Sequence, residues 1–198
     1  KYDLLVIGFG KAGKTLAATF GNEGKKVAVI EESSEMYGGT CINIGCIPTK
    51  TLIVAADNKK DFKEAKTTRD TVVSKLNAKN FAMLENNPNI DVYTASAKFV
   101  SNKVVEISVD GETKKLEGDI VVINTGAKNN VLPIPGLTTS KNVYDSTQLQ
   151  KLESAPKTLG IIGGGNIGIE FANLYARFGV DVTVIDFAPT VLGREDKD

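Results

Sequence analysis

Short apolar runs alternate along this chain with segments whose apolar positions recur at helical spacing. The first run, 4–7 (LLVI), ends in a glycine-rich turn, and a segment with helical spacing follows as far as Gly24. A second run, 27–31 (VAVIE), closes on an acidic residue. A strand, a helix and a second strand in this order predict a βαβ unit with two parallel strands.

The same pattern returns near the carboxyl end of the chain. Residues 157–168 (KTLGIIGGGNIG) repeat the apolar run and glycine turn of residues 2–13 (YDLLVIGFGKAG), a helical segment stops at Gly179, and 182–186 (VTVID) again ends on an acid. The first glycine and the terminal acid are 23 residues apart in both copies. The chain therefore contains two βαβ units at an offset of 155 residues.

One face of each helix should contact its sheet, because apolar residues recur on that face. The expected contact residues are Ala12, Leu16, Thr19 and Phe20 in the first helix, and Ile167, Phe171, Leu174 and Phe178 in the second.

Each glycine turn has the spacing G-x-G-x-x-G, formed by Gly8, Gly10 and Gly13 in the first unit and by Gly163, Gly165 and Gly168 in the second. In this fingerprint the first glycine makes the tight turn, the second admits a pyrophosphate and the third lets helix and strand pack closely. The helix start then binds phosphate, and the closing acid accepts from ribose hydroxyls. A glycine-rich helix cap is the alternative, but strand, helix, strand and acid all in register favour nucleotide binding. Two such units predict two dinucleotides, as in a flavin–nicotinamide relay.

The region between the units predicts one helix and several strands. A surface helix is expected within 57–87, from apolar positions at Phe62, Val73, Leu76 and Met83. Residues 90–100, 103–109 and 113–117 alternate and predict a small antiparallel meander with a turn at Asp110–Gly111, and 119–123 predicts a buried strand of the parallel sheet. Residues 133–136 lead out of the first domain, and the boundary falls near 154–156. The fold class expected is therefore α/β: a Rossmann-like domain with a small meander, followed by the start of a second Rossmann-like domain.

The composition of the chain argues against several classes of function. The chain has 198 residues, 24 basic and 24 acidic side chains, and a pI near 6.6. This balance gives no basic surplus for nucleic acid or anionic lipid. The longest apolar run, 52–56, is far shorter than a membrane span, and no secretory signal is expected at the amino end. The absence of histidine excludes a Ser-His or Cys-His pair and a His-ligated metal within these residues.

The two cysteines lie between the units, in 38–50 (GGTCINIGCIPTK). Two thiols cannot form a four-ligand zinc site. A structural disulfide is the alternative to a redox pair, but a neutral chain without a signal is expected in the cytoplasm, where stable disulfides are uncommon. Cys41 and Cys46 are five residues apart, so bonding requires a distorted helix turn, which Gly45 and Pro48 allow. A helix start would also lower the thiol pKa. We therefore expect a redox dithiol.

The segment GGTCINIGCIPTK resembles the active-site segment of the flavoprotein disulfide reductases, the family of lipoamide dehydrogenase, glutathione reductase and mercuric reductase. Residues 6–17, 36–52 and 143–147 are similar to the bacterial branch that contains the reactive-chlorine-resistance flavoprotein and hypothiocyanous acid reductase. The resemblance extends over the whole chain. It implies an FAD-binding domain over 1–150 and the beginning of an NAD(P)-binding domain over 157–198.

The resemblance also implies roles for individual residues. The catalytic residues would be Cys41, the interchange thiol; Cys46, the charge-transfer thiol; and Lys50, which would lie near the flavin and pair with Glu170. The expected FAD contacts are Gly8, Gly10, Lys11, Ala12, Gly13, Glu31, Glu32, Gly39, Thr40, Cys41, Cys46, Lys50, Ala97, Thr125 and Gly126. The expected nicotinamide-nucleotide contacts are Gly163, Gly165, Asn166, Ile167, Gly168, Glu170 and Asp186. An acid at Asp186 favours NADH over NADPH, although Arg194 could contact a phosphate.

The implied activity is electron transfer from NAD(P)H through FAD to Cys41 and Cys46, and on to an oxidised small molecule such as hypothiocyanous acid or to a disulfide. Two alternatives remain: another family member, such as a lipoamide, glutathione or mercuric reductase, and a non-catalytic FAD-binding fragment. A plain NAD-dependent dehydrogenase leaves the cysteine motif unexplained. Because the family is more than twice as long, we expect this chain to be an amino-terminal fragment, inactive alone, of a cytoplasmic homodimer without a metal site.

Overall fold

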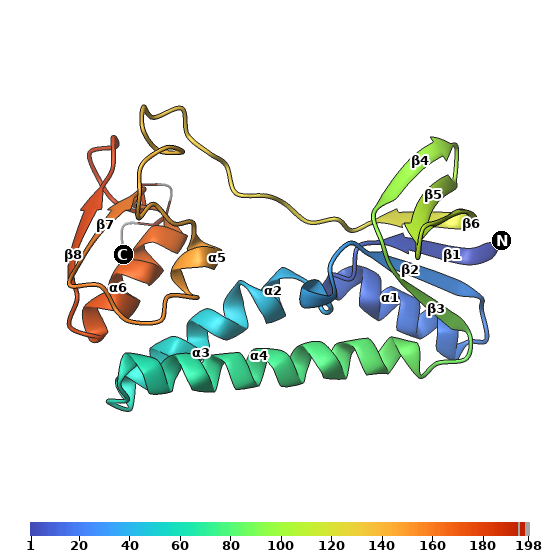
Figure 1. The fold of residues 1–198 in the computed structure, drawn as a ribbon, viewed down its shortest axis with the longest axis horizontal. Helices are drawn as coiled ribbons and strands as arrows, with labels where there is room; N and C mark the ends of the chain where they lie inside the picture. Colours follow the sequence, from blue (N-terminus) through green and yellow to red (C-terminus); the bar gives the residue numbers. More distant parts are fainter. Residues whose placement is uncertain (194, 197–198) are drawn as a thin grey trace. The chain divides into compact units, whose positions relative to one another are not determined.

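A computed structural model describes residues 1–193 and 195–196 (Figure 1). Its elements in chain order are β1 (Tyr2–Ile7), α1 (Lys11–Asn22), β2 (Val27–Glu31), the 3-10 turn η1 (Ser34–Met36), α2 (Thr40–Asn43), α3 (Cys46–Asp57), α4 (Phe62–Glu85), β3 (Ile90–Thr94), β4 (Ala97–Ser101), β5 (Val104–Val109), β6 (Glu112–Ile123), α5 (Ser146–Leu149), β7 (Thr158–Ile162), α6 (Asn166–Arg177) and β8 (Asp181–Ile185). They group into two compact units, residues 1–47 with 73–129 and residues 48–72 with 130–198.

The first unit contains a six-stranded sheet in the order β3-β2-β1-β6-β5-β4. The strands β3, β2, β1 and β6 pair in parallel, whereas β6, β5 and β4 pair antiparallel. Strand β6 is twelve residues long and joins the two parts: its first half pairs with β5 and its second half with β1. The predicted α/β fold with a small antiparallel meander is therefore confirmed.

Each face of this sheet has its own apolar core. On one face α1 and α4 cover alternate residues of β1 and β2, including Leu4, Val6, Val27 and Val29, all without solvent exposure. On the other face the remaining residues of these strands pack against the meander, where Val105 is fully buried. Burial on both faces explains the continuous apolar runs of β1 and β2.

The second unit contains the parallel pair β7-β8 and the helix α6, which contacts both strands. Its core includes Phe171, Leu174 and Tyr175 from α6 and Leu52 from α3. Alternate residues of both strands are exposed, so the described part of this sheet has one covered face. The two-strand sheet agrees with the expectation that this region is the beginning of a Rossmann-like domain.

The predicted helix faces were wrong at several positions. Ala12 and Thr19 are exposed, because α1 packs through its buried residues Gly13, Ala17 and Gly21 instead. A side chain on Gly13 would stand 2.6 Å from Val6 Cγ1, so small residues allow the helix to approach the sheet more closely than a larger apolar face would.

In α6 Ile167 is 65% exposed, contrary to prediction, whereas Phe171 and Leu174 are buried as predicted. In α4 Met83 is exposed and its neighbour Leu84 is buried. At Ala12 and Met83 the buried position is the next residue along the helix. The helix termini at Gly24 and Gly179 agree with prediction: both follow their helices with φ near +80°.

The strand prediction for 90–100 was also wrong in topology. This segment divides at residues 95–96 into β3, which extends the parallel sheet, and β4, which belongs to the meander. The segments 113–117 and 119–123 form the single strand β6, and the turn at Asp110–Gly111 is present with both residues at positive φ. The second half of β6 joins the parallel sheet as predicted but is not buried: Ile120 is 48% and Ile123 68% exposed.

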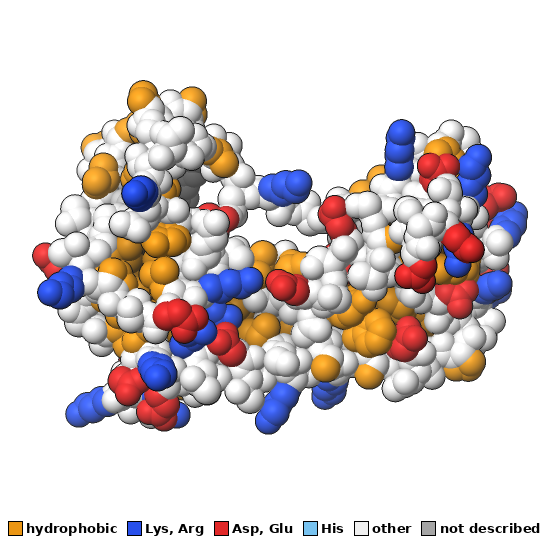
Figure 2. Space-filling model, in the orientation of Figure 1, with side chains coloured by type: hydrophobic (Ala, Val, Ile, Leu, Met, Phe, Trp, Pro, Cys, Tyr) orange, Lys and Arg blue, Asp and Glu red, His pale blue; other side chains and the backbone are white. Residues whose placement is uncertain are grey.

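The surface carries charges of both signs. Lys and Arg side chains are interspersed with Asp and Glu over the face drawn in Figure 2, as the balanced composition predicts. Among the described residues, none of the helices combines the length and the apolar character needed to cross a bilayer.

Candidate functional site

The first glycine-rich loop connects β1 to α1 and is closely packed. Gly8 has a φ of +100°, and a side-chain carbon there would stand 2.2 Å from the carbonyl oxygen of Asn124, which follows β6. The side-chain amide nitrogen of Asn124 would lie 2.7 Å from a side-chain carbon on Gly10 and 2.7 Å from one on Gly13. All three glycines are therefore required by close approach, and Gly8 also by its backbone conformation.

Helix α1 begins in this loop with its amino end free to bind an anion. Its N-cap is Gly10, which offers no side-chain hydrogen bond, and its first turn contains no acidic residue. Lys11 and Ala12 in that turn are exposed. An uncapped helix start with exposed N–H groups and a nearby lysine fits a pyrophosphate.

Glu31 at the end of β2 holds this loop. One of its carboxylate oxygens accepts from Phe9 N at 2.8 Å and the other from Ser33 N at 3.2 Å. Asp186 after β8 repeats both contacts at the offset of 155 residues, accepting from Gly164 N at 2.5 Å and from Ala188 N at 2.8 Å. These backbone hydrogen bonds hold the pKa of Asp186 below its ordinary value.

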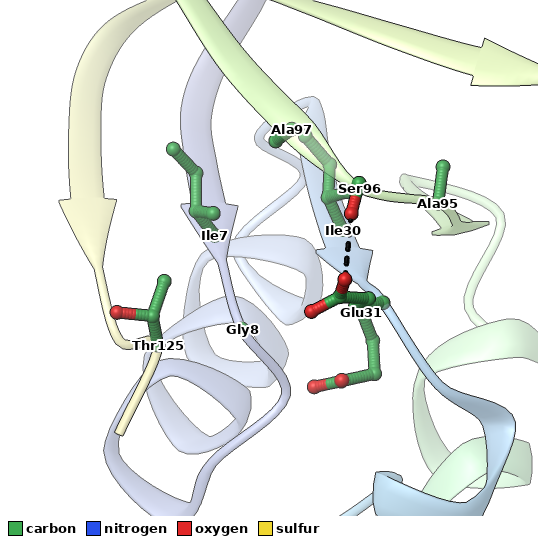
Figure 3. A pocket seen from close by; sticks show the side chains of 9 residues that line it. Ile7, Gly8, Ile30, Glu31, Ala95, Ser96, Ala97 and Thr125 are labelled. Carbon is green, nitrogen blue, oxygen red and sulfur yellow. Dashed lines mark hydrogen bonds between the residues drawn. The ribbon is translucent and has the colours of Figure 1, made fainter. Parts of the chain in front are cut away.

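A cavity of about 140 Å³ opens beside Glu31 at the carboxyl ends of β1 and β2 (Figure 3). The hydroxyl of Ser96 donates to Glu32 at 2.9 Å across its wall, the dashed line in Figure 3. The lining residues are Ile7, Gly8, Ile30, Glu31, Glu32, Ala95, Ser96, Ala97 and Thr125. The cavity thus brings together five residues predicted from sequence to contact a dinucleotide, and its acids and small apolar residues suit an adenosine moiety.

The second glycine-rich loop has the same backbone but more open surroundings. Gly163 has a φ of +111°, and no atom of the described residues lies within 4 Å of a side-chain carbon built on Gly163 or on Gly165. Gly168 is closely packed, because a side chain there would meet the carbonyl oxygen of Gly163 at 2.0 Å. Helix α6 starts without a side-chain cap, as α1 does.

The other residues predicted for this loop lie at the start of α6. Asn166 donates to Glu195 at 3.0 Å and is exposed, as is Ile167. Arg194, predicted as a further phosphate contact, lies outside the described residues.

The cysteine segment lies against the first loop. A side chain on Gly39 would stand 2.6 Å from the Cα of Gly10, so these two glycine backbones touch. Thr40 begins α2 directly after Gly39, and its hydroxyl oxygen lies 3.9 Å from the position of a side-chain carbon on Gly126. The structure therefore places Gly39, Thr40 and Gly126 beside the first loop.

Cys41 and Cys46 belong to two different helices. Cys41 lies in the four-residue α2, and Cys46 is the first residue of α3. The break between them is at Gly45, where a side chain would meet the carbonyl oxygen of Thr40 at 3.1 Å. The predicted distortion of the helix turn is confirmed: α2 ends at Asn43, α3 begins at Cys46, and neither thiol is in a disulfide.

The predicted lowering of the thiol pKa was wrong for Cys41. Its hydrogen bond with Cys46, followed by burial, raises the pKa of Cys41 above the ordinary value, although Lys11 acts in the opposite direction. A thiol that donates a hydrogen bond is stabilised in its protonated form, and Cys41 takes that part beside Cys46. The short helix α2 provides too small a dipole to reverse this effect.

Lys50 on α3 and Glu170 on α6 form an ion pair in the second unit, the pairing that the resemblance implied. Lys50 is exposed and Glu170 is half-buried. Among the described residues no group of three or more Cys, Asp or Glu side chains is arranged to hold a metal ion.

Sequence reasoning missed Asn124, which lies against all three glycines of the first loop. The signal was available: Asn124 directly follows an apolar strand and precedes the predicted contact Thr125. In parallel sheets the ligand lies at the carboxyl ends of the strands. Sequence reasoning also missed three buried or half-buried asparagines near the cysteine segment, because no pattern comparable to that of Asn124 marks them in the sequence: Asn43, Asn77 and Asn80.

Comparisons with known proteins agree with this geometry. The sequence profile described as "Pyridine nucleotide-disulphide oxidoreductase" matches residues 2–198. The chain is 50% identical over 198 residues to the probable pyridine nucleotide-disulfide oxidoreductase RclA of Escherichia coli, covering 100% of this chain and 45% of RclA. It is 34% identical over 214 residues to the dihydrolipoyl dehydrogenase of Thermus scotoductus, of which it covers 44%.

Solved structures give the same result. The Cu(II) complex of the HOCl-induced flavoprotein disulfide reductase RclA from Escherichia coli matches with a TM-score of 0.97 at 50% identity, covering 100% of this chain and 45% of that one. Another RclA structure matches with a TM-score of 0.95. The chain thus spans less than half the length of these relatives. Its glycine-rich loops, cysteine segment and matching profile show that it belongs to the pyridine nucleotide-disulphide oxidoreductase family.

Proposed function

We propose that this chain forms part of a flavoprotein reductase in which FAD binds to the first unit and Cys41 with Cys46 forms the redox centre. The contact between Gly39 and Gly10 carries this proposal. It fixes the cysteine segment against the loop that suits a pyrophosphate, so a dinucleotide bound there would lie next to the thiols.

The residues of the first unit fit FAD. The amino end of α1 and the backbone of Gly39 would face the pyrophosphate, and the carboxylate of Glu31 keeps acceptor capacity for ribose hydroxyls. The cavity at Ala97 and Thr125 would take the adenine end. These contacts extend to Gly8, Lys11, Ala12, Gly13, Glu32, Thr40 and Gly126, and the domain would comprise residues 1–150.

The second unit would hold the nicotinamide nucleotide, as the beginning of a domain over 157–198. Asp186 is charged and points at the loop backbone, and a carboxylate there would repel a 2′-phosphate. NADH is therefore favoured over NADPH. The ion pair of Lys50 with Glu170 would neutralise the lysine charge near the flavin ring.

When bound, FAD would accept a hydride equivalent from the nicotinamide nucleotide and pass two electrons to a disulfide between Cys41 and Cys46. The chain's own contribution is the break at Gly45, which lies against the backbone of Thr40 and Cys41 and separates the helices that carry the two thiols. Cys41 would meet the substrate, and Cys46 would face the flavin.

The substrate that best suits this arrangement is hypothiocyanous acid or a related small oxidant. The Cys41 thiolate would attack the sulfur, forming a Cys41–S–SCN bond and releasing hydroxide. The Cys46 thiolate would then attack the Cys41 sulfur, forming the disulfide and releasing thiocyanate. The support is the similarity to RclA, described as HOCl-induced. The similarity to dihydrolipoyl dehydrogenase supports a dithiol–disulfide substrate such as lipoamide as the second candidate.

The complete enzyme would be a cytoplasmic homodimer that binds neither nucleic acid nor membrane. The 198 residues alone would bind flavin weakly and show no turnover, because the second unit has only two strands among its described residues. Rapid oxidation of NADH by this chain alone would contradict the last statement.

The test is steady-state oxidation of NADH by the full-length gene product, with hypothiocyanous acid and lipoamide supplied separately. We expect flavin in the purified protein, faster turnover with NADH than with NADPH, and faster turnover with hypothiocyanous acid than with lipoamide. Preference for lipoamide would favour the second candidate. A protein that binds no flavin would exclude both.

A further inference from the structure

The cysteine segment is introduced by two successive glycines in the left-handed region. Gly38 has a φ of +93° and Gly39 of +82°. This double turn directs Thr40 and Cys41 toward the glycine-rich loop, with Gly39 touching Gly10. Two flexible residues separated from Cys41 only by Thr40 would leave the position of this thiol undetermined unless neighbouring groups hold the turn.

Asn43 holds the turn from inside. Its side chain is only 6% exposed, and its amide nitrogen donates to the carbonyl oxygens of Tyr37 and Gly39, both at 2.9 Å. These two carbonyls flank Gly38. One side chain therefore fixes both ends of the turn, and it lies in the same short helix as Cys41.

Helix α4 holds the turn from outside, with two asparagines on one face. Asn77 donates to the side-chain oxygen of Asn43 at 3.0 Å and to the carbonyl oxygen of Ser34 at 3.1 Å. Asn80, which is 8% exposed, lies 3.2 Å from the position that a side-chain carbon on Gly38 would take.

Asn80 also connects the turn to the helix that starts in the glycine-rich loop. Its side-chain oxygen accepts from the ammonium group of Lys14 on α1, and its amide nitrogen donates to Leu76 O at 2.6 Å. Three elements that are distant in sequence, α1, α2 and α4, thus meet at these side chains. Asparagine suits Asn43 and Asn80, since each donates and accepts in a place nearly closed to water, and the half-buried Asn77 adds two donated hydrogen bonds.

We propose that Asn43, Asn77 and Asn80, which we call the asparagine clamp, are positioning residues that hold the Gly38–Gly39 turn and so fix the place of Cys41 in α2 relative to Cys46. This inference rests on the proposed function only in that it takes Cys41 as a redox thiol. The clamp touches neither thiol directly, and it acts through the turn and the helix α2.

The consequence is a measurable change at Cys41 when the clamp is loosened. In the intact protein the hydrogen bond with Cys46 and burial raise the pKa of Cys41, and Lys11 is the charged side chain that acts against them. If α2 can move, the thiol–thiol contact is lost more often. The pKa of Cys41 then moves down toward its ordinary value, and the thiol reacts faster at neutral pH.

The experiment measures alkylation of each cysteine by iodoacetamide against pH, with peptide mass spectrometry, in the reduced full-length gene product. The variants are Asn77→Ala and Asn80→Ala, and the matched control is Thr71→Ala. Thr71 lies on the same helix, is exposed, and makes a side-chain hydrogen bond only to Thr67 O among those that the structure describes. Circular dichroism verifies that each variant is folded.

We expect the pH midpoint for Cys41 to fall, and its rate at neutral pH to rise severalfold, in both clamp variants but not in Thr71→Ala. Unchanged alkylation profiles of Cys41 in folded Asn77→Ala and Asn80→Ala would overturn the proposed role of the asparagine clamp. Failure of the proposed function is a separate result, because it would appear as wild-type cysteines that NADH does not reduce, whatever the alkylation profile.

Discussion

In the first βαβ unit Glu31 accepts from the backbone of Phe9, and in the second Asp186 accepts from the backbone of Gly164, the residue that occupies the same place 155 positions later. The loops differ in what surrounds them. Asn124 after β6 fills the space over Gly8, whereas the space over Gly163 is open. A third parallel strand next to β1 accounts for this difference, and no described strand takes that place next to β7.

Comparing the two loops distinguishes two contributions to a dinucleotide site: the hydrogen bonds between loop and acid, and the packing around the first glycine. The hydrogen bonds between loop and acid form in both units, so the strand–helix–strand sequence alone is sufficient to produce them. Close packing on the first glycine is present only where the neighbouring strand supplies Asn124. Local sequence therefore fixes the path of the backbone, and the rest of the sheet determines how tightly the loop is held.

The first βαβ unit is followed in the chain by the cysteine segment, and its loop touches Gly39. If this contact marks the redox centre, Cys41→Ser and Cys46→Ser should each reduce oxidant-dependent NADH turnover to the rate without enzyme, because the substrate step needs both thiols. Stopped-flow assays of the full-length gene product would show this. Substantial turnover in either variant would place the redox centre elsewhere.

The packing difference predicts unequal costs for the same substitution. Gly8→Ala should lower the free energy of unfolding by about 2–6 kcal/mol, since strained backbone and overpacking each cost about 1–3 kcal/mol. Gly163→Ala has the backbone cost alone, about 1–3 kcal/mol. Urea titration, with hydrogen exchange of peptides from β1 and β7 to assign each unit, measures both. Equal losses would contradict the role given to Asn124.

Replacing Glu31 should affect the binding of FAD, and replacing Asp186 should affect the binding of the nicotinamide nucleotide. Glu31→Ala should weaken FAD binding by about 1–3 kcal/mol, because it leaves partners unpaired, which is roughly 5- to 150-fold in dissociation constant. Asp186→Ala should leave FAD binding unchanged and reduce the preference for NADH over NADPH. Flavin release during dialysis and KM values for the two nucleotides are the measurements. Loss of FAD from Asp186→Ala would mean that the assignments are exchanged.

The smallest expected effect is a pH dependence of the second loop. Backbone hydrogen bonds from Ala188 and Gly164 lower the pKa of Asp186 from its ordinary value of 3.8. Its contribution to stability is therefore complete above that value and is lost as the pH falls through the lower, folded-state pKa. Hydrogen exchange of residues 163–168 should accelerate in that acidic range, and Asp186→Asn should remove the acceleration. Because Asp186 is only half-buried, solvent screens its charge and the effect should be small.

The sequence predicts some parts of the fold better than others. The spacing of glycines and acids predicted both βαβ units, because their contacts are local, but not the hydrogen bonds that Glu31 and Asp186 accept from the loop backbones. The helix faces at Ala12 and Ile167 were predicted wrongly, because the distance between helix and sheet depends on Gly13 and Gly168 rather than on apolar spacing. The exposed end of β6 could not be foreseen, since burial there depends on neighbouring elements and not on the apolar run itself.

For the candidate site the limits are similar. The cysteine motif predicted a redox pair and an interrupted helix, but not the raised pKa of Cys41, which depends on the contact with Cys46. The asparagine clamp spans residues 43 and 77–80, and nothing in the local sequence marks such a long-range contact.

The proposed chemistry depends above all on the roles of the two thiols: Cys41 meets the substrate while Cys46 faces the flavin of the first unit. The decisive measurement is the visible absorption spectrum of Cys41→Ser in the full-length gene product, recorded without reductant across the pH range of thiol ionisation. Without its partner, Cys46 is a free thiolate, so we expect a long-wavelength charge-transfer band that is absent from oxidised wild type. A spectrum with no such band at any pH would contradict the assignment of the two thiols.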